Sequence, residues 1–380
     1  STQPRTPPPA LGVIFPLPIH RCYNMAMDEK PTIAKRSQEI SSRAMQSATN
    51  GRFSPADQLH TSTRKVSVRE RSCISGRIVA INAYCINLTL LKQRLGEGGY
   101  QLHETPHFLF CLRDEEPTTI VVHWFAPAEV DANVGQYFMQ ELKPFGLLTD
   151  PQSYGDLFSA VVCSLAPRDP QHALYLYATN TLRRYRHNLS SEHAHAIDFA
   201  NDAPIAVFSR LYRRVYELQR GEMFLDAGCS FGFLPLLLAE RFPALRQVVG
   251  VDIQTDSFTI VQRIAQERGL TNVSFAQADL LSDGVSEFGS FDTVTLLHVL
   301  EHFTEEEMDR VLAHLLPMVA QRLIIAVPYE SDEPEAAFGH KQLFTRSRLE
   351  AVGEWCLRQW EGQGRMWYED CADGLIVLER

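Results

Sequence analysis

The feature that most constrains the fold is a regular alternation of short apolar runs and helix-length segments in the C-terminal half of the chain. The runs are five to seven residues long: MFLDA (223–227), QVVGVDI (247–253), VSFAQAD (273–279), FDTVTLL (291–297) and RLIIAVP (322–328). Strands that are covered on both faces are apolar almost throughout. The pattern therefore predicts a parallel sheet built from right-handed crossovers.

The end of the chain changes direction. RMWYED (365–370) and GLIVLER (374–380) are joined by only three residues, a connection that antiparallel strands alone can make. An amphipathic helix with Asp202 as N-cap and Pro204 in its first turn opens the region. We predict an α/β domain at 203–380 with a Rossmann-like, seven-stranded mixed sheet: five parallel strands plus a C-terminal antiparallel hairpin.

A second domain, of α+β type, is predicted at 76–202. Residues 76–125 are predicted to be rich in strands, because RIVAINAYCINLTLL is β-branched and apolar, and a hairpin is expected around Asp114–Pro117. Helices are expected near 128–142, 155–165 and 172–187. No motif assigns this domain a role, and substrate recognition and oligomerisation both stay open.

The first 75 residues carry 11 basic and 5 acidic side chains and are rich in Ser, Thr, Pro and Gln. Such a composition does not repay the entropy of ordering, so we expect a flexible basic tail at 1–75. The alternatives are an organelle transit peptide and, before Met25 or Met27, residues foreign to the natural chain.

Charge and composition limit the partners. Residues 203–380 hold 16 basic against 27 acidic side chains, and the whole chain has a net charge of -10, which disfavours a nucleic-acid partner. No apolar run approaches the roughly 18 residues of a membrane span. Eight scattered cysteines without a CxxC pair fit a reducing compartment, and we expect a cytoplasmic protein. The oligomeric state stays open.

The carboxyl ends of parallel strands are where such sheets bind ligands. After the first run comes Asp226-Ala-Gly228-Cys-Ser230-Phe-Gly232, and glycines there let the backbone approach a ligand at a helix N-terminus. A dinucleotide fingerprint, GxGxxG, would need glycine at Ser230 and Phe233. Pyrophosphate binding is therefore not predicted.

The next two strands end in acids. Asp252 follows Asp226 by 26 residues, and Asp279 follows by a further 27. A carboxylate offers two acceptor oxygens, which suits the paired hydroxyls of a ribose at the second strand and an exocyclic amine at the third. Because no lysine stands near the glycine turn, the pattern predicts a site for an adenosine that carries positive charge and no phosphate.

These motifs make the segment 203–380 resemble a class I S-adenosylmethionine-dependent methyltransferase. FLDAGCSFGFL resembles the family's glycine-rich motif, VVGVDI and FAQADL its second and third strand ends, and FDTVTLLHVLEHF its fourth strand. Ser230 replaces the middle glycine, a position where a small residue with a negative φ would still fit. The resemblance implies S-adenosylmethionine as cofactor, held by Asp226, Gly228, Ser230, Gly232, Asp252, Ile253, Asp279, Leu280 and Leu297.

The stretch HVLEH contains His298, Glu301 and His302 in the HxxEH spacing of zinc peptidases. Those enzymes carry the motif on a long helix, whereas here it follows a strand and the helix is expected to begin at Thr304. We therefore favour a methyltransferase pocket. His298 is the predicted catalytic base, with His340 second, because histidine titrates near neutral pH.

A metal site is the alternative for the same residues. His298, Glu301, His302 and His340 resemble the Glu/His metal site of small-RNA 2'-O-methyltransferases, in which a divalent ion activates the attacking hydroxyl. Our preferred interpretation assigns no metal: Glu301 and His302 brace the strand end, and His340 holds its loop. A second conceivable ligand set is interpreted as an exposed linker: Glu192, His193, His195 and Asp198.

The function predicted from the sequence is methyl transfer to oxygen or nitrogen, with carbon as a further option, of a small-molecule acceptor by in-line displacement. A small molecule is favoured because 296–345 resembles quinone-biosynthesis O-methyltransferases. Two alternatives stay open. One is an RNA or protein methyltransferase that uses 76–202 for recognition, and the other is a non-catalytic partner subunit that binds the cofactor.

Overall fold

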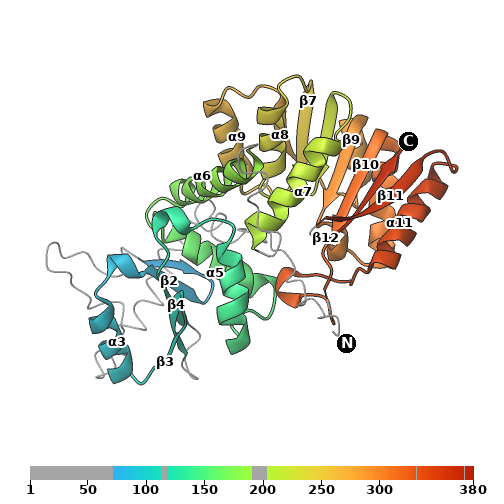
Figure 1. The fold of residues 1–380 in the computed structure, drawn as a ribbon. Helices are drawn as coiled ribbons and strands as arrows, with labels where there is room; N and C mark the ends of the chain where they lie inside the picture. The colour runs from blue at the N-terminus through green and yellow to red at the C-terminus, as the bar shows by residue number, and fades with distance from the viewer. Residues whose placement is uncertain (1–71, 113–117, 191–202, 331, 372) are drawn as a thin grey trace, which may run out of the picture. The chain divides into compact units, whose positions relative to one another are not determined.

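A computed structural model describes residues 72–112, 118–190, 203–330, 332–371 and 373–380 (Figure 1). The chain forms two compact units that divide between Thr181 and Leu182, inside a long helix. The predicted tail lies outside the described residues, except that Ser72–Ser75 form a strand. The residues interpreted as an exposed linker, Glu192, His193, His195 and Asp198, also lie outside them. In the described ranges, no helix has the length and apolar content that a membrane crossing requires.

The N-terminal unit contains a five-stranded sheet in the order β1-β2-β5-β4-β3. β2 and β5 are parallel, and the other neighbours are antiparallel, including β4 and β5, which form the predicted hairpin. The strands are β1 (Ser72–Ser75), β2 (Ile78–Asn82), β3 (Gln101–Glu104), β4 (Phe108–Leu112) and β5 (Thr119–His123).

Helices and short turns lie between and after these strands in the sequence. The α-helices are α3 (Leu88–Glu97), α4 (Val134–Tyr137), α5 (Pro151–Cys163) and α6 (Pro170–Leu189); the short turns are η3 (Ala83–Cys85), η4 (Pro127–Glu129), the π-turn η5 (Phe138–Leu142) and η6 (Lys143–Phe145). α5 and α6 lie where helices were predicted, whereas the helix expected over 128–142 is continuous only from Val134.

One strand prediction was wrong. The residues NLTLL, which we included in an extended segment, open helix α3 instead. Asn87 is the N-cap, and its side chain accepts a hydrogen bond from the backbone N–H of Leu90 at 3.0 Å. The buried residues of α3 are Leu91 and Leu95, four apart on one helical face. The cap and this spacing outweigh the β propensity of the sequence.

The C-terminal unit contains a seven-stranded mixed sheet in the order β11-β12-β10-β9-β6-β7-β8, which confirms the predicted fold class (Figure 1). β6 to β10 are mutually parallel, and β12 is antiparallel to both β10 and β11. The strands are β6 (Met223–Ala227), β7 (Gln247–Asp252), β8 (Val273–Gln277), β9 (Phe291–Leu297), β10 (Val319–Val327), β11 (Arg365–Cys371) and β12 (Asp373–Glu379).

Helices cover both faces of this sheet. Residues of α10 and α11 share one core with Leu225, Val249 and Leu323, while Gly250, which points to the opposite face, lies against Pro235 of α8. The helices are α7 (Pro204–Leu218), α8 (Phe233–Arg241), α9 (Phe258–Glu267), α10 (Glu305–Leu315) and α11 (Arg346–Gln359), with short 3-10 turns η8 (Asp283–Phe288), η9 (Leu300–His302), η10 (Leu316–Met318) and η11 (Ala336–Phe338).

The predicted N-cap residue is confirmed for helix α10 and stays untested for helix α7. Thr304 is the N-cap of α10, as predicted, and forms a reciprocal capping box with Glu307. The N-cap of α7 is Ala203, with Pro204 in the first turn. The predicted cap Asp202 lies outside the described residues.

Candidate functional site

The glycine turn between β6 and α8 is built by backbone that only glycine adopts easily. Gly228 has φ +78° and Gly232 has φ +85°. A Cβ on Gly228 would lie 2.6 Å from a methyl group of Val299, and one on Gly232 would lie 2.5 Å from the ring of Phe275. Both glycines are therefore required by conformation and by space.

Ser230 lies at the centre of this turn with φ +50°, and not with the negative φ that the sequence allowed for a small residue. Its backbone N–H donates a hydrogen bond to Oδ2 of Asp252 at 2.8 Å. The serine thus adopts the left-handed conformation that a glycine would adopt, and the link to Asp252 holds it there.

Asp252 ends β7 and organises the neighbouring backbone. Besides Ser230, the backbone N–H of Gln254 donates to its Oδ1 at 2.9 Å. Burial raises the pKa of Asp252, and the two backbone hydrogen bonds act in the opposite direction. Each oxygen keeps a second lone pair for a hydroxyl. The next residue, Ile253, presents an apolar side chain that is 54% exposed.

Asp226 is the most deeply buried acid of the turn. The hydroxyl of Thr295 on β9 donates to its Oδ1 at 2.7 Å. Burial raises the pKa of Asp226 to about 7, and this hydrogen bond opposes the increase. The sheet pairs β6 with β7 and β7 with β8. Asp226 in β6, Asp252 at the end of β7 and Asp279 just after β8 therefore lie towards the carboxyl ends of three adjacent parallel strands.

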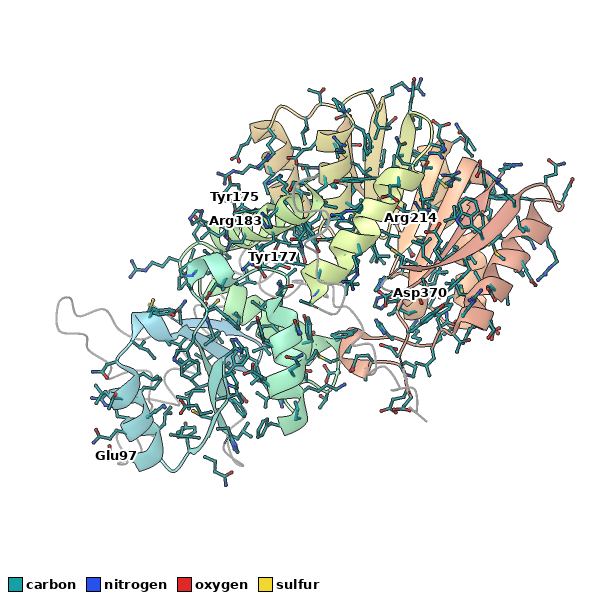
Figure 2. All side chains as sticks on the ribbon, in the orientation of Figure 1. Glu97, Tyr175, Tyr177, Arg183, Arg214 and Asp370 are labelled. Atoms are coloured by element: carbon teal, nitrogen blue, oxygen red, sulfur yellow. The ribbon has the colours of Figure 1, made fainter. Side chains whose placement is uncertain are left out.

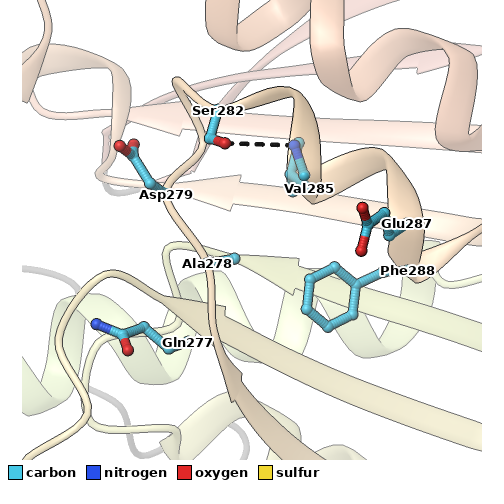
Figure 3. Close-up of a pocket in the computed structure, with 8 residues that line it drawn as sticks. Gln277, Ala278, Asp279, Ser282, Val285, Glu287 and Phe288 are labelled. Atoms are coloured by element: carbon cyan, nitrogen blue, oxygen red, sulfur yellow. Dashed lines mark hydrogen bonds between the residues drawn. The ribbon is translucent and has the colours of Figure 1, made fainter.

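Asp279 follows β8 and is exposed at the rim of a surface pocket of about 460 Å³ (Figure 3). The backbone N–H of Leu281 donates to its Oδ1 at 2.9 Å. The pocket is lined by Gln277, Ala278, Asp279, Ser282, Gly284, Val285, Glu287 and Phe288. Leu280, a predicted pocket wall, is buried in the core, and Leu297 is buried at the end of β9.

His298 comes directly after β9 and has φ +55°, a left-handed conformation that non-glycine residues adopt rarely. Its backbone N–H donates to the carbonyl of Ala326 on β10 at 2.9 Å. The ring lies 5.0 Å from the ring of Phe208 on α7, measured between centroids. Nε2 is 3.0 Å from Oδ2 of Asp373, and Nδ1 is 3.9 Å from Oε1 of Glu301.

The charge balance around His298 is set by three acids. Burial alone lowers the pKa of the imidazole, but the nearby Asp373, Glu301 and Glu330 outweigh burial and raise it. Glu301 is buried completely, which raises the pKa of its carboxyl group. Neither oxygen of Glu301 has a hydrogen-bond partner among the described residues.

Glu301, His302 and His340 converge. One potential ligand atom from each lies within 4.8 Å of the others. The fourth residue of the predicted metal set, His298, is not part of this group. Nδ1 of His340 is 2.7 Å from Glu330, which fixes the direction of that ring. Burial and the neighbouring His340 lower the pKa of His302 to about 3, so this imidazole is neutral.

The local fold removes the zinc-peptidase interpretation of HxxEH. Glu301 and His302 lie in the three-residue turn η9, between strand β9 and helix α10, and not on a long helix.

Sequence reasoning missed three residues of this site: Thr295, Glu330 and Asp373. Thr295 is a polar residue within an apolar strand, a signal that could have been noticed. Asp373 lies at a hairpin turn, where an acid is ordinary. Only the strand order brings it to His298.

Comparison with known proteins bears on the same segment. Residues 224–321, from β6 into β10, match the family model described as a methyltransferase domain. The C-terminal unit is a class I S-adenosylmethionine-dependent methyltransferase domain. S-adenosylmethionine is accordingly the cofactor that goes with this domain.

Curated relatives match parts of the methyltransferase domain. The chain is 31% identical over 83 residues to the ubiquinone biosynthesis O-methyltransferase of Paracidovorax citrulli, covering 22% of this chain and 34% of the relative. It is 34% identical over 108 residues to the magnesium-protoporphyrin O-methyltransferase of Synechocystis, covering 28% and 44%. The chain thus spans less than half the length of these relatives.

Solved structures with a similar fold include an O-methyltransferase family protein from Burkholderia thailandensis, with TM-score 0.40 and 19% identity over 67% of this chain and 88% of the other. The magnesium protoporphyrin IX methyltransferase of Synechocystis with bound SAH has TM-score 0.32 and 23% identity, covering 46% of this chain and 81% of the other.

Proposed function

We propose that the chain transfers the methyl group of S-adenosylmethionine to an oxygen or nitrogen of a small-molecule acceptor, with carbon as the further option. The observation that carries the proposal is the set of three acids on adjacent parallel strands around a glycine turn. The curated relatives, whose printed names describe O-methyltransferases, support the acceptor class.

In this proposal the carboxyl ends of β6, β7 and β8, which we call the cofactor half, bind S-adenosylmethionine by shape and charge. The turn from Gly228 to Gly232 brings backbone close to the methionine part of the cofactor. Asp252 accepts hydrogen bonds from the ribose hydroxyls, and Asp279 accepts one from the adenine amine. Ile253 and the rim of the pocket at Asp279 contribute apolar and polar surface to the adenosine. Leu280 and Leu297 shape the walls from within the core.

Methyl transfer from a sulfonium is an in-line displacement, and holding the two reactants in line supplies several kcal/mol of the barrier. A base is needed only when the acceptor atom bears a proton. We propose His298 as that base, and His340 as the second candidate. The pair of His340 with Glu330 holds its ring in one orientation.

The chemistry of Glu301, His302 and His340 also fits a divalent cation, because one carboxylate and two imidazoles are a common mixed ligand set. Such an ion would polarise an acceptor oxygen. Our preferred proposal remains that these residues brace the edge of the sheet without metal.

The proposal is tested by calorimetry and product analysis. Isothermal titration with S-adenosylmethionine and S-adenosylhomocysteine should show binding of both compounds. Mass spectrometry over a panel of phenolic, quinol, amine, peptide and RNA acceptors should then show a mass gain of one methyl group on a small molecule. Methylation of RNA or peptide would favour the recognition-module alternative, and binding without transfer to any acceptor would favour a partner subunit. A cytoplasmic location stays a prediction.

A further inference from the structure

The imidazole of His298 lies between two buried carboxylates. The side chains of His298, Asp373 and Glu301 are 3%, 4% and 1% exposed. Among the described residues, neither ring nitrogen has an aligned hydrogen bond, and neither do Oδ2 of Asp373 or the two oxygens of Glu301. Buried polar groups almost always have partners. The described residues thus leave these polar atoms without hydrogen bonds, and the geometry of the ring and the two acids decides what they can do.

The two carboxylates differ in their relation to the ring. Nε2 lies 3.0 Å from Asp373, within contact distance but not aligned as a hydrogen bond. Nδ1 lies 3.9 Å from Glu301, which is too far for a hydrogen bond. Catalytic hydrogen bonds are often poorly aligned before substrate binds and tighten in the complex. Asp373 is therefore the acid that can hold the ring.

The sheet topology carries Asp373 to this place. β12 is antiparallel to β10, so its first residues lie at the edge where the parallel strands end, and Gly374 pairs with Val327. A Cβ on Gly374 would lie 2.2 Å from the hydroxyl of Tyr329. The glycine thus allows the hairpin to pack closely against the segment after β10, next to the ring of His298.

The backbone of His298 supports a functional role. A left-handed conformation at a residue other than glycine is strained and is concentrated at active sites. The hydrogen bond from its N–H to Ala326 and the contact of its ring with Phe208 fix the direction of the side chain from two elements. The ring is thus held in place at its backbone, its face and its Nε2 atom.

We propose that Asp373 is a positioning residue. Its carboxylate accepts a hydrogen bond from the Nε2–H group of His298, which leaves Nδ1 as the atom that receives a proton from the acceptor. The inference rests on the proposed function and narrows it to acceptors with a dissociable O–H or N–H. In the transfer step that bond breaks and its proton goes to Nδ1. The acceptor's electron pair forms the new bond to the methyl carbon, and the C–S bond breaks with its electrons on sulfur, which releases S-adenosylhomocysteine.

The kinetic test is Asp373→Asn, which keeps the size of the side chain and removes its charge. We expect kcat to fall about 100-fold, the usual contribution of a positioned base, while KM for both substrates changes less than about threefold. Asp373→Glu should recover a large part of the lost kcat. Asp370→Asn, on β11 of the same hairpin and exposed, is the matched control and should leave kcat unchanged (Figure 2).

Two results with these variants would overturn the assignment of Asp373. One is a kcat of Asp373→Asn within about twofold of wild type, far below the contribution expected of a positioned base. The other is a parallel loss of kcat, cofactor affinity and thermal stability in both Asp373→Asn and Asp373→Glu, which is what a purely structural residue would show.

A second readout does not require an acceptor. In protein labelled with ¹⁵N-histidine and saturated with S-adenosylhomocysteine, the ring of His298 should be protonated on Nε2 and bare on Nδ1 near pH 8, and Asp373→Asn should change this tautomer. The signal is assigned by its loss in His298→Asn. A proton on Nδ1 in the wild type contradicts the inference. If no acceptor is methylated at all, the proposed function fails, and the tautomer still decides the role of Asp373.

Discussion

The two halves of the carboxyl edge of the seven-stranded sheet treat their buried acids in opposite ways. On β6 and β7, Asp226 accepts from Thr295, and Asp252 accepts from two backbone N–H groups. Glu301 follows β9 and Asp373 begins β12, and both have carboxylate oxygens without hydrogen bonds to the described residues. A buried carboxylate oxygen that lacks a hydrogen bond is costly. The comparison teaches that, among the described residues, the acids of the proposed cofactor half have hydrogen-bond donors and those of the proposed acceptor half do not.

The strongest way to break this comparison is to disturb the completed half. In Gly228→Ala, a Cβ would lie 2.6 Å from Val299 in a residue with φ +78°. We expect affinity for S-adenosylmethionine to fall more than about 100-fold, because strain of about 1–3 kcal/mol adds to a displaced turn. Titration calorimetry measures this.

The matched control is Gly269→Ala. Gly269 has φ +68°, but a Cβ there would meet no atom within 4 Å. It should cost stability through backbone strain alone and leave cofactor affinity unchanged. Equal losses of affinity in the two variants would show that the turn at Gly228 has no special role.

The acceptor half is tested by His298→Asn, which tolerates the left-handed backbone. We expect kcat to fall about 10²–10⁴-fold while the dissociation constant of S-adenosylmethionine changes little, because the ring would act on the acceptor and not on the cofactor. Single-turnover kinetics and calorimetry separate the two quantities. An equal loss of both would move His298 to the cofactor half.

A smaller effect is expected from Asp226, whose pKa is raised to about 7 from 3.8. The folded chain then holds a proton that the unfolded chain has lost, so this group makes the free energy of unfolding fall as pH rises from about 4 to 7, by a few kcal/mol at most. Asp226→Asn should remove that slope in urea titrations across the window. The exposed Asp370→Asn should keep it. A variant slope equal to that of wild type contradicts the assignment.

The smallest effect is expected from chelation. If Glu301, His302 and His340 brace the edge without metal, methyl transfer in EDTA should match the untreated rate. A rate that falls in EDTA and returns with one divalent ion would select the cation alternative. Glu301→Gln distinguishes the cases further, because it should abolish any such stimulation by removing a charged ligand.

The sequence predicted the sheet well because strands buried on both faces leave a continuous apolar record. β6 and β9 have the predicted bounds, and helix α10 has its N-cap at the predicted residue Thr304. The sequence did not predict helix α3, where the N-cap hydrogen bond of Asn87 outweighs the β propensity of the following residues. Nor did it predict the backbone of Ser230, where a hydrogen bond to Asp252 holds a conformation that residue type alone does not reveal.

For the candidate site, the sequence located residues at strand ends but not their partners. The hairpin was predictable, whereas its docking was not assigned from the sequence: β12 lies between β10 and β11. A signal was present in the sequence, because GLIVL is apolar throughout whereas RMWYED contains charged residues. The structure buries the first stretch and leaves β11 largely half-buried, as an inner strand and an edge strand should be. Without that order, Asp373 is one turn residue among many.

The sequence by itself determined the class of fold, the acidic strand ends and the glycine turn, since these follow from local periodicity and from the chemistry of single residues. The tertiary structure alone decided that Asp373 stands against His298 and Glu330 against His340. The physical reason is that such pairs join residues on separate elements, so strand order and packing set their distance and burial, and no local pattern encodes either.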